Sequence, residues 1–305
     1  MRTKDQYIEA LGKMKRNIYF NGEKISRDDE LQMDCINTIG LTYDEAAKPE
    51  NADLMLAKSH LTGETINRFT HIHQNTDDLH KKQDMTRFLC GKVGGCIQRC
   101  MGIDGTNAAY AVSYEADKLN NGATEYHENF KKWLTRFQQE DLIGCCAQTD
   151  VKGDRLKRPA DQVDPDMYVR IKERTNDGIV VSGCKVHISE ASVADEVLVV
   201  PTRALRAEDK DYAVAFAVPG DWDGMKQVTT IHNYRQREHF KRGFQPGATD
   251  SYIIFDDCFI PWERVFLAGE YQHGGVLALL FALFHRHSYS GCKPAIGDVL
   301  LGTAA

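Results

Sequence analysis

The sequence has no apolar run long enough to cross a bilayer, and its first 15 residues lack the apolar core of a secretory signal peptide. It also has no basic tract with interleaved aromatic residues, and its formal net charge is −6. Nucleic acid is therefore not an expected partner. Together these absences predict a cytoplasmic protein that binds neither membrane nor nucleic acid.

Motifs for nucleotide binding through a Rossmann or P-loop site are also missing. No Gly-x-Gly-x-x-Gly follows a predicted strand, and no Walker-type loop is present. A disulfide framework is not expected either, because the nine cysteines are odd in number and are scattered through 305 residues. Reduced thiols are expected, and some of them can serve as ligands.

Hydrophobic periodicity changes twice along the chain. Residues 3–140 are dominated by helical spacing, and Thr3 can cap the first helix. Short β-rich runs follow from Met167, with a hairpin signal at 176–178, and helical spacing returns at Tyr271. We therefore predict an α+β multi-domain protein with a compact β-barrel or sandwich between helical parts.

The predicted domains are an N-terminal helical domain at 1–143, a middle β-barrel domain at 144–268 and the start of a C-terminal helical domain at 269–305. The chain ends on apolar, helix-forming residues without a stop signal. This ending predicts that the chain is a fragment.

Cys96 and Cys100 are four residues apart in a segment that we predict to be helical, so that both thiols share one face. Three glycines between residues 91 and 95 weaken that helix, which is understandable if something packs close to its backbone. His285 and Cys292, seven residues apart, complete a set of three thiols and one imidazole. Inert, packed cysteines and close helix packing remain the alternatives at this point.

Two loops of the β region have unusual polar content. Hydroxyls, backbone amides and a glycine can hydrogen-bond the polar edge of an isoalloxazine, and Arg or Lys can meet phosphates. Two ordinary solvated loops are the alternative. The candidate flavin-binding residues are Gln148, Thr149, Lys152, Gly153, Asp154 and Arg155 in the first loop, and His187, Ser189 and Glu190 in the second.

Three motifs, taken together, resemble the acyl-CoA dehydrogenase fold. They are Thr149-Asp150-x-x-Gly153-Asp154, Ser182-Gly183-x-Lys185-x-His187-Ile188-Ser189 and Phe255-Asp256-Asp257-Cys258-Phe259-Ile260-Pro261. Within that fold the chain is most similar to the 4-hydroxybutyryl-CoA dehydratase family, in the branch that resembles 4-hydroxyphenylacetate 3-hydroxylase. The four positions of the Cys-x3-Cys and His-x6-Cys ligand pattern of that family are all matched.

The resemblance implies FAD at the two loops, an acyl-CoA substrate, a homotetramer, and a 4Fe-4S cluster held by Cys96, Cys100, His285 and Cys292. It implies a hydro-lyase that dehydrates 4-hydroxybutyryl-CoA to crotonyl-CoA by a radical route and also isomerises vinylacetyl-CoA.

The implied catalytic residues are His285, as ligand and base, with Tyr289, Lys293 and Asp250; Asp250 stands where the family has a glutamate. Three alternatives remain: an FAD-dependent aromatic monooxygenase of the 4-hydroxyphenylacetate 3-hydroxylase type, an inactive fragment of the dehydratase, and a Cys3His zinc protein.

Overall fold

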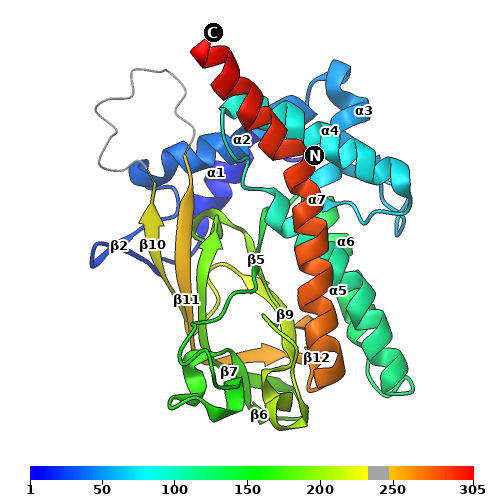
Figure 1. Ribbon diagram of the computed structural model, residues 1–305, viewed down its shortest axis with the longest axis vertical. Helices are drawn as coiled ribbons and strands as arrows, with labels where there is room; N and C mark the ends of the chain where they lie inside the picture. Colours follow the sequence, from blue (N-terminus) through cyan, green and yellow to red (C-terminus); the bar gives the residue numbers. More distant parts are fainter. Residues whose placement is uncertain (233–246) are drawn as a thin grey trace.

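The computed structural model describes residues 1–232 and 247–305. The helices lie across the top and along the right of the molecule in Figure 1, and the sheets lie at the lower left; the last helix, α7 (Tyr271–Ala304), runs from the top down the right. Thr3 caps α1 with a capping box completed by Gln6, as its sequence predicts. The other α-helices of the described N-terminal part are α2 (Met33–Ala46), α3 (Ala52–Met55), α4 (Thr76–Val93), α5 (Cys100–Leu119) and α6 (Tyr126–Gln139), after α1 (Lys4–Lys13).

The strands form open sheets, so the predicted closed barrel is not seen in the described residues. The six-stranded sheet has the order β2 (Glu23–Ile25), β1 (Ile18–Phe20), β10 (Met225–Ile231), β11 (Thr249–Pro261), β7 (Gly178–Ser189) and β6 (Arg170–Arg174). The four-stranded sheet has the order β12 (Val265–Ala268), β9 (Val214–Pro219), β8 (Glu196–Val199) and β5 (Gly144–Ala147). A small hairpin of β3 (Leu56–Lys58) and β4 (Thr65–Asn67) stands apart.

The sequence predicts one of the two hairpins described next and does not predict the other. The hairpin at 176–178 joins β6 and β7 in antiparallel register, as predicted. A second one, at Asn21-Gly22, was missed; both residues have positive φ, of 50° and 86°, as the tight turn between β1 and β2 requires. Because β1 pairs in parallel with β10, the N-terminal segment contributes strands to the large sheet.

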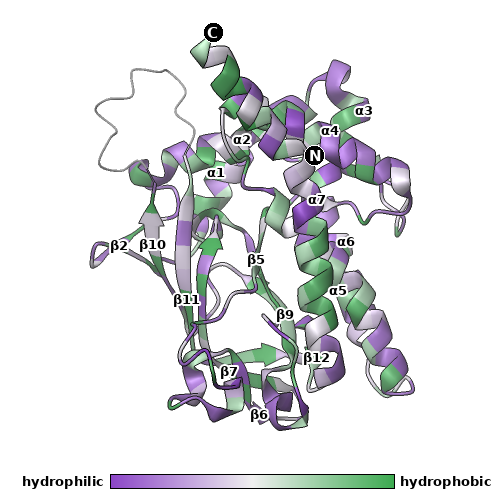
Figure 2. Cartoon of the chain, viewed as in Figure 1, coloured by the Kyte–Doolittle hydropathy of each residue, from purple (hydrophilic) through white to green (hydrophobic). Residues whose placement is uncertain are grey.

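Helix α7 packs against α4 and α5. Gly291 makes the contact with α4 close, since a Cβ there would overlap Thr86 Oγ1 and the carbonyl of Gln83. The other side of α7 carries exposed apolar residues, among them Leu279 and Leu283, at 55% and 50% exposure. The hydropathy colouring of Figure 2 shows hydrophobic stretches along α7. None of the described helices is long and apolar enough to cross a membrane.

Candidate functional site

The two cysteines of the Cys-x3-Cys motif do not share a helix, which corrects the prediction. Helix α4 ends at Val93, and Gly94 caps it in the left-handed conformation, with φ of 67° and its N–H donated to the Cys90 carbonyl. A glycine in this conformation ends a helix because it has no Cβ to strain. Cys96 is therefore an exposed loop residue, whereas Cys100 is the buried first residue of α5.

His285 and Cys292 lie on one stripe of α7. Seven residues make almost two full helical turns, so the two side chains share a face about 10 Å apart along the axis. Cys292 belongs to the same buried apolar cluster as Cys100 and Cys90. Cys90 was not singled out in the sequence; its thiol hydrogen-bonds Cys292 and thereby lowers the pKa of Cys292.

Cys96, Cys100 and His285 each lie close enough to Cys292 to interact with it electrostatically. Burial raises the pKa of the Cys100 thiol well above its usual value, and the charges of Asp104, Cys96 and Cys292 raise it further. In the described part of the chain, no three His, Cys, Asp or Glu side chains converge closely enough to hold a single metal ion. A tetrahedral zinc site needs such convergence, whereas the ligands of a cubane bind separate irons.

His285 is held between a carboxylate and a phenol. Its Nδ1 lies 2.9 Å from Asp104 Oδ2, and its Nε2 lies 3.0 Å from the Tyr289 hydroxyl one turn further along α7. The Lys293 ammonium stands 5.0 Å from the centre of the Tyr289 ring. The structure therefore brings together three of the predicted catalytic side chains, His285, Tyr289 and Lys293.

Asp104 is a residue that the sequence gave no reason to select. It is completely buried, forms an ion pair with the equally buried Lys82, and accepts hydrogen bonds from Ser288 at 3.1 and 3.2 Å. Its one local signal is its place in α5, one helical turn after Cys100. Its partners come from α4 and α7, so only the packing of three helices reveals the network.

The two predicted flavin-binding segments lie side by side, but only the first is a loop: His187 and Ser189 belong to strand β7, which corrects the prediction of a second loop, and Glu190 follows that strand. Lys185 Nζ forms a buried ion pair with Asp150 at 2.8 Å, and it also donates to the carbonyl oxygens of Gln148 and Val200. The side chain of Gln148 in turn donates to the Ala278 carbonyl of α7 at 3.2 Å. Because Ala278 precedes His285 by seven residues, the loop meets the stripe of α7 that carries the histidine.

The second half of the first loop is open to solvent. Lys152, Gly153, Asp154 and Arg155 are all exposed, while Thr149 is partly buried. Gly153 has φ of 52° and allows the chain to turn there. The basic side chains on this turn are free to meet an anionic group, whereas Asp154 caps its own turn by accepting from the Leu156 N–H.

A third group of predicted residues lies where β7, β10 and β11 pair. Asp250 accepts a hydrogen bond from Ser189 at 2.6 Å, and its Oδ2 lies 2.9 Å from His232 Nε2. The exposed ring of His187 lies edge-on to Tyr252 with ring centres 6.0 Å apart. His187, Asp250 and Tyr252 help to line a small pocket of about 90 Å³.

Glu190 differs from the other candidates because its side chain is turned into the core. Neither carboxylate oxygen has a hydrogen-bond partner among the described residues, and the backbone N–H is donated to the Thr249 carbonyl. Burial raises its pKa well above the usual value, although the nearby Arg99 guanidinium opposes this rise. In this conformation the carboxyl group is fully screened from solvent and faces no ligand at the surface.

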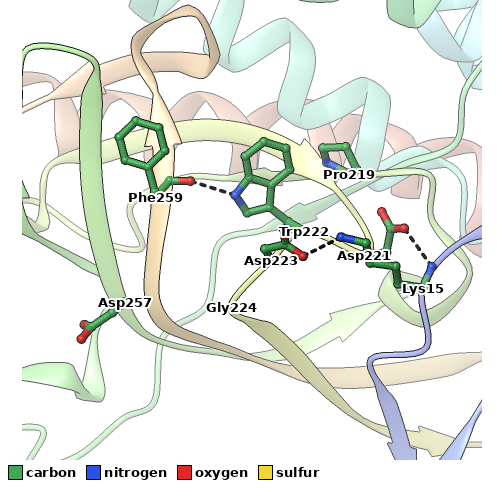
Figure 3. A pocket seen from close by; sticks show the side chains of 8 residues that line it. All are labelled: Lys15, Pro219, Asp221, Trp222, Asp223, Gly224, Asp257 and Phe259. Atoms are coloured by element: carbon green, nitrogen blue, oxygen red, sulfur yellow. Dashed lines mark hydrogen bonds and ion pairs between the residues drawn. The ribbon is translucent and has the colours of Figure 1, made fainter.

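A larger pocket of about 530 Å³ contains none of the predicted site residues (Figure 3). Its polar groups are already paired: Lys15 binds Asp223 at 2.6 Å and Asp221 through its backbone N–H, and the Trp222 indole donates to the Phe259 carbonyl. We therefore place the candidate site at α7 and the adjacent segments 148–155 and 187–190. There, Asp104 and Tyr289 contact His285, and the basic side chains of Lys152 and Arg155 are exposed.

Comparison with known proteins identifies the class of protein and then the family. The fold is acyl-CoA dehydrogenase-like, and it matches an oxygen-tolerant archaeal 4-hydroxybutyryl-CoA dehydratase from N. maritimus with a TM-score of 0.93 and 35% identity. The oxygenase component of 4-hydroxyphenylacetate 3-monooxygenase, complexed with FAD, superimposes with a TM-score of 0.80 at 24% identity. Residues 3–267 match the family described as 4-hydroxyphenylacetate 3-hydroxylase N terminal, and the chain belongs to that family.

Among curated relatives, the 4-hydroxybutyryl-CoA dehydratase/vinylacetyl-CoA-Delta-isomerase of Clostridium aminobutyricum is 43% identical over the whole chain. The resemblance predicted from the motifs is thereby confirmed. The chain spans 64% of the length of that relative, 61% of the archaeal structure and 63% of the oxygenase structure.

Proposed function

We propose that this chain carries the cofactor sites of a flavin- and 4Fe-4S-dependent hydro-lyase that converts 4-hydroxybutyryl-CoA to crotonyl-CoA and also isomerises vinylacetyl-CoA. The observation that carries the proposal is the stripe of α7 on which His285 and Cys292 lie, with Cys100 in the same buried cluster as Cys292. The dehydratase names of the relatives from Clostridium aminobutyricum and N. maritimus agree with it.

The donor set fits an iron-sulfur cluster in its chemistry. Three thiols and one imidazole suit iron in a cubane, and the hydrogen bond that His285 Nδ1–H donates to Asp104 leaves Nε2 as the ring nitrogen with a lone pair. We assign Cys96, Cys100, Cys292 and His285 as the groups that would hold it. When bound, the cluster supplies a Lewis-acidic iron for the leaving hydroxyl, and the flavin supplies one-electron chemistry.

The flavin assignment rests on the loop at 148–155 and the adjacent end of β7. Exposed Lys152 and Arg155 can pair with phosphates, and the loop hydroxyl of Thr149 can hydrogen-bond the ring system. The ion pair between Asp150 and Lys185 fixes the loop to β7. The FAD in the structurally similar oxygenase supports a flavin site in this fold.

The remaining predicted residues hold or move protons. His285 Nε2, when free, can accept a proton from the substrate, and the Tyr289 hydroxyl next to it can donate to the substrate's oxygen. Lys293 lies close enough to Tyr289 to orient the thioester or hydroxyl of an acyl-CoA. Asp250, already bonded to Ser189, is the second candidate base.

We also propose the domain boundaries predicted from the sequence and a homotetrameric assembly. The connections from α6 to β5 and from β12 to α7 support boundaries near 143 and 268, with β1 and β2 of the first part pairing onto the large sheet. For the assembly, the exposed side chains of Val276, Leu279 and Leu283 form an apolar stripe on α7 that suits another subunit. Sedimentation should detect association, and Leu283→Lys should weaken it, whereas Lys293→Met on the polar side of α7 should not.

The test of function is the cofactor content of anaerobically purified protein. We expect about four irons and four sulfides per chain, together with FAD. Cys96→Ser, Cys100→Ser and Cys292→Ser should each lose iron and sulfide, whereas Cys258→Ser, at a buried thiol of β11, should keep both. Stoichiometric zinc without sulfide would overturn the cluster assignment.

Flavin and activity are measured on the same preparations. Thr149→Ala and Arg155→Ala should lower the FAD content and leave iron in place, with Arg16→Ala as the exposed control. Formation of crotonyl-CoA from 4-hydroxybutyryl-CoA tests the reaction itself. An aromatic monooxygenase is the second candidate, since the family match is to 4-hydroxyphenylacetate 3-hydroxylase; it predicts iron-free protein that hydroxylates 4-hydroxyphenylacetate with reduced flavin and oxygen.

A further inference from the structure

We infer that Asp104 is a positioning residue that fixes which ring nitrogen of His285 carries the proton. Asp104 Oδ2 lies 2.9 Å from Nδ1 of His285, and the carboxylate is completely buried. An ionised carboxylate only accepts hydrogen bonds, so the group facing it at this distance is an Nδ1–H. Nε2 is then the nitrogen left with a lone pair, directed toward the hydroxyl of Tyr289.

Two further groups hold the Asp104 carboxylate in its orientation. Lys82 Nζ, with no exposed surface, forms an ion pair with Asp104 Oδ1 and donates to the Phe284 carbonyl, the residue before His285. Ser288 Oγ, on the next turn of α7, donates to the same carboxylate. The carboxylate is thus held from α4 and α7 while it is itself part of α5, and its Oδ2 is directed at the histidine.

This arrangement deepens the proposed function and rests on it. A metal-binding histidine usually donates its second ring N–H to a carboxylate or carbonyl, which fixes the ring and makes the binding nitrogen more basic. For a ligand that also serves as a base, the tautomer decides whether Nε2 can do either. Asp104, paired with Lys82, therefore fixes the tautomer and ring orientation of His285 before a cluster or substrate binds.

Asp104→Asn changes the tautomer in a direction that the structure predicts. Lys82 Nζ has only donors, so the amide oxygen introduced by the substitution stays on the side of Lys82. The amide NH2 then faces Nδ1 of His285, which can pair with it only through its lone pair. We expect the proton to move to Nε2, as in the Asn replacement of the triad aspartate in serine proteases.

The test is nitrogen NMR of 15N-histidine-labelled full chain, purified without iron, with His285→Gln to assign the resonances. Native protein should show His285 protonated at Nδ1, and Asp104→Asn should show it protonated at Nε2. Asp298→Asn, an exposed carboxylate on α7 that pairs with Arg87, is the matched control and should leave the tautomer unchanged. Native protein protonated at Nε2, or an unchanged tautomer in Asp104→Asn, would overturn the inference.

A second variant covers the case in which Asp104→Asn folds poorly because the charge of the buried Lys82 has lost its counter-ion. Lys82→Met combined with Asp104→Asn removes that charge and frees the amide to turn its oxygen toward His285, so the Nδ1–H tautomer should return. Persistence of the Nε2–H form would contradict the role given to Lys82. The neighbouring Lys81→Met, whose lysine pairs with exposed Asp53, is the control.

Reconstituted protein separates this inference from the proposed function. With iron and sulfide added anaerobically, Asp104→Asn should lose iron to a chelator 10–100-fold more readily than the native protein, as expected for loss of an outer partner of a ligand. If no cluster forms in the native chain but the tautomer follows Asp104, the positioning role stands and the proposed function fails. If the cluster forms and its retention is the same in native and Asp104→Asn protein, the positioning role fails and the proposed function stands.

Discussion

Glu190→Gln should stabilise the protein at neutral pH, and by an amount that grows with pH. The Glu190 carboxyl is fully buried, and neither oxygen has a hydrogen-bond partner in the described residues. Burial raises its pKa well above the usual value of 4.5. The folded protein therefore holds a proton that the unfolded chain releases, and folding must keep that proton bound.

The sign and size follow from proton linkage. Since the pKa is raised in the folded state, the stability is fully present below the unfolded pKa and is lost as pH rises toward the folded pKa. The loss is about 1.4 kcal/mol for each pH unit over which the folded protein keeps the proton. Gln has nearly the same shape, takes the same backbone with φ of 60°, and does not titrate in this range. The difference between Glu190→Gln and native protein should thus widen by about 1.4 kcal/mol per pH unit.

Urea denaturation followed by tryptophan fluorescence measures this difference at about pH 5, 6, 7 and 8. Glu173→Gln, at an exposed position of β6, is the control and should track the native curve at every pH. Parallel pH profiles for native protein and Glu190→Gln would refute the reasoning, because they would show that the Glu190 carboxyl titrates alike in the folded and unfolded states.

Two further predictions concern packing and the buried ion pair. Gly102→Ala in α5 should lower the free energy of unfolding by at least about 1 kcal/mol, because the added Cβ overlaps the Gly144 carbonyl of β5. The control Gly297→Ala in α7 meets open space and should raise the free energy of unfolding by up to about 1 kcal/mol. Thermal melts of both variants measure the two effects, and equal effects would contradict the close approach of α5 to β5. Lys185→Met should destabilise the protein by about 3–5 kcal/mol, because the buried Asp150 carboxylate loses its ion-pair partner. Burial raises the pKa of Asp150, so this loss of stability should be smaller at low pH, where Asp150 is protonated. Denaturation at two pH values measures the loss, and a pH-independent loss would show that Asp150 is not left charged.

Local chemistry was readable from the sequence wherever the signal and its effect lie within a few residues. Thr3 caps α1 because its hydroxyl reaches an N–H three residues on, and the turn at 176–178 sets the hairpin of β6 and β7. The spacing of His285 and Cys292 predicted a shared face because helical geometry repeats almost every seven residues. The family followed from contiguous motifs for the same reason, and the match to relatives confirmed it.

The helix predicted over Cys96 and Cys100 was wrong, because one backbone conformation interrupts the helical periodicity of the apolar residues. Helical spacing placed Cys96 and Cys100 in one helix, but Gly94 adopts a left-handed conformation that ends α4 before either cysteine. The glycine was visible, and its effect on helix stability was anticipated. The glycine at which α4 ends depends on how α4 and α5 pack, and the spacing of apolar residues does not specify that packing.

Only the tertiary structure decided the partners of His285 and the environment of Glu190. Asp104 and His285 are separated by 181 residues, and they meet because α5 and α7 pack together. The only local feature of Asp104 is its place one helical turn after Cys100, and nothing local to Lys82 marks it as buried. A charge enters the interior only when a partner from another element compensates it, so the assignment of such groups requires the three helices in place. The sequence thus determined which residues were available, and packing determined which of them face one another.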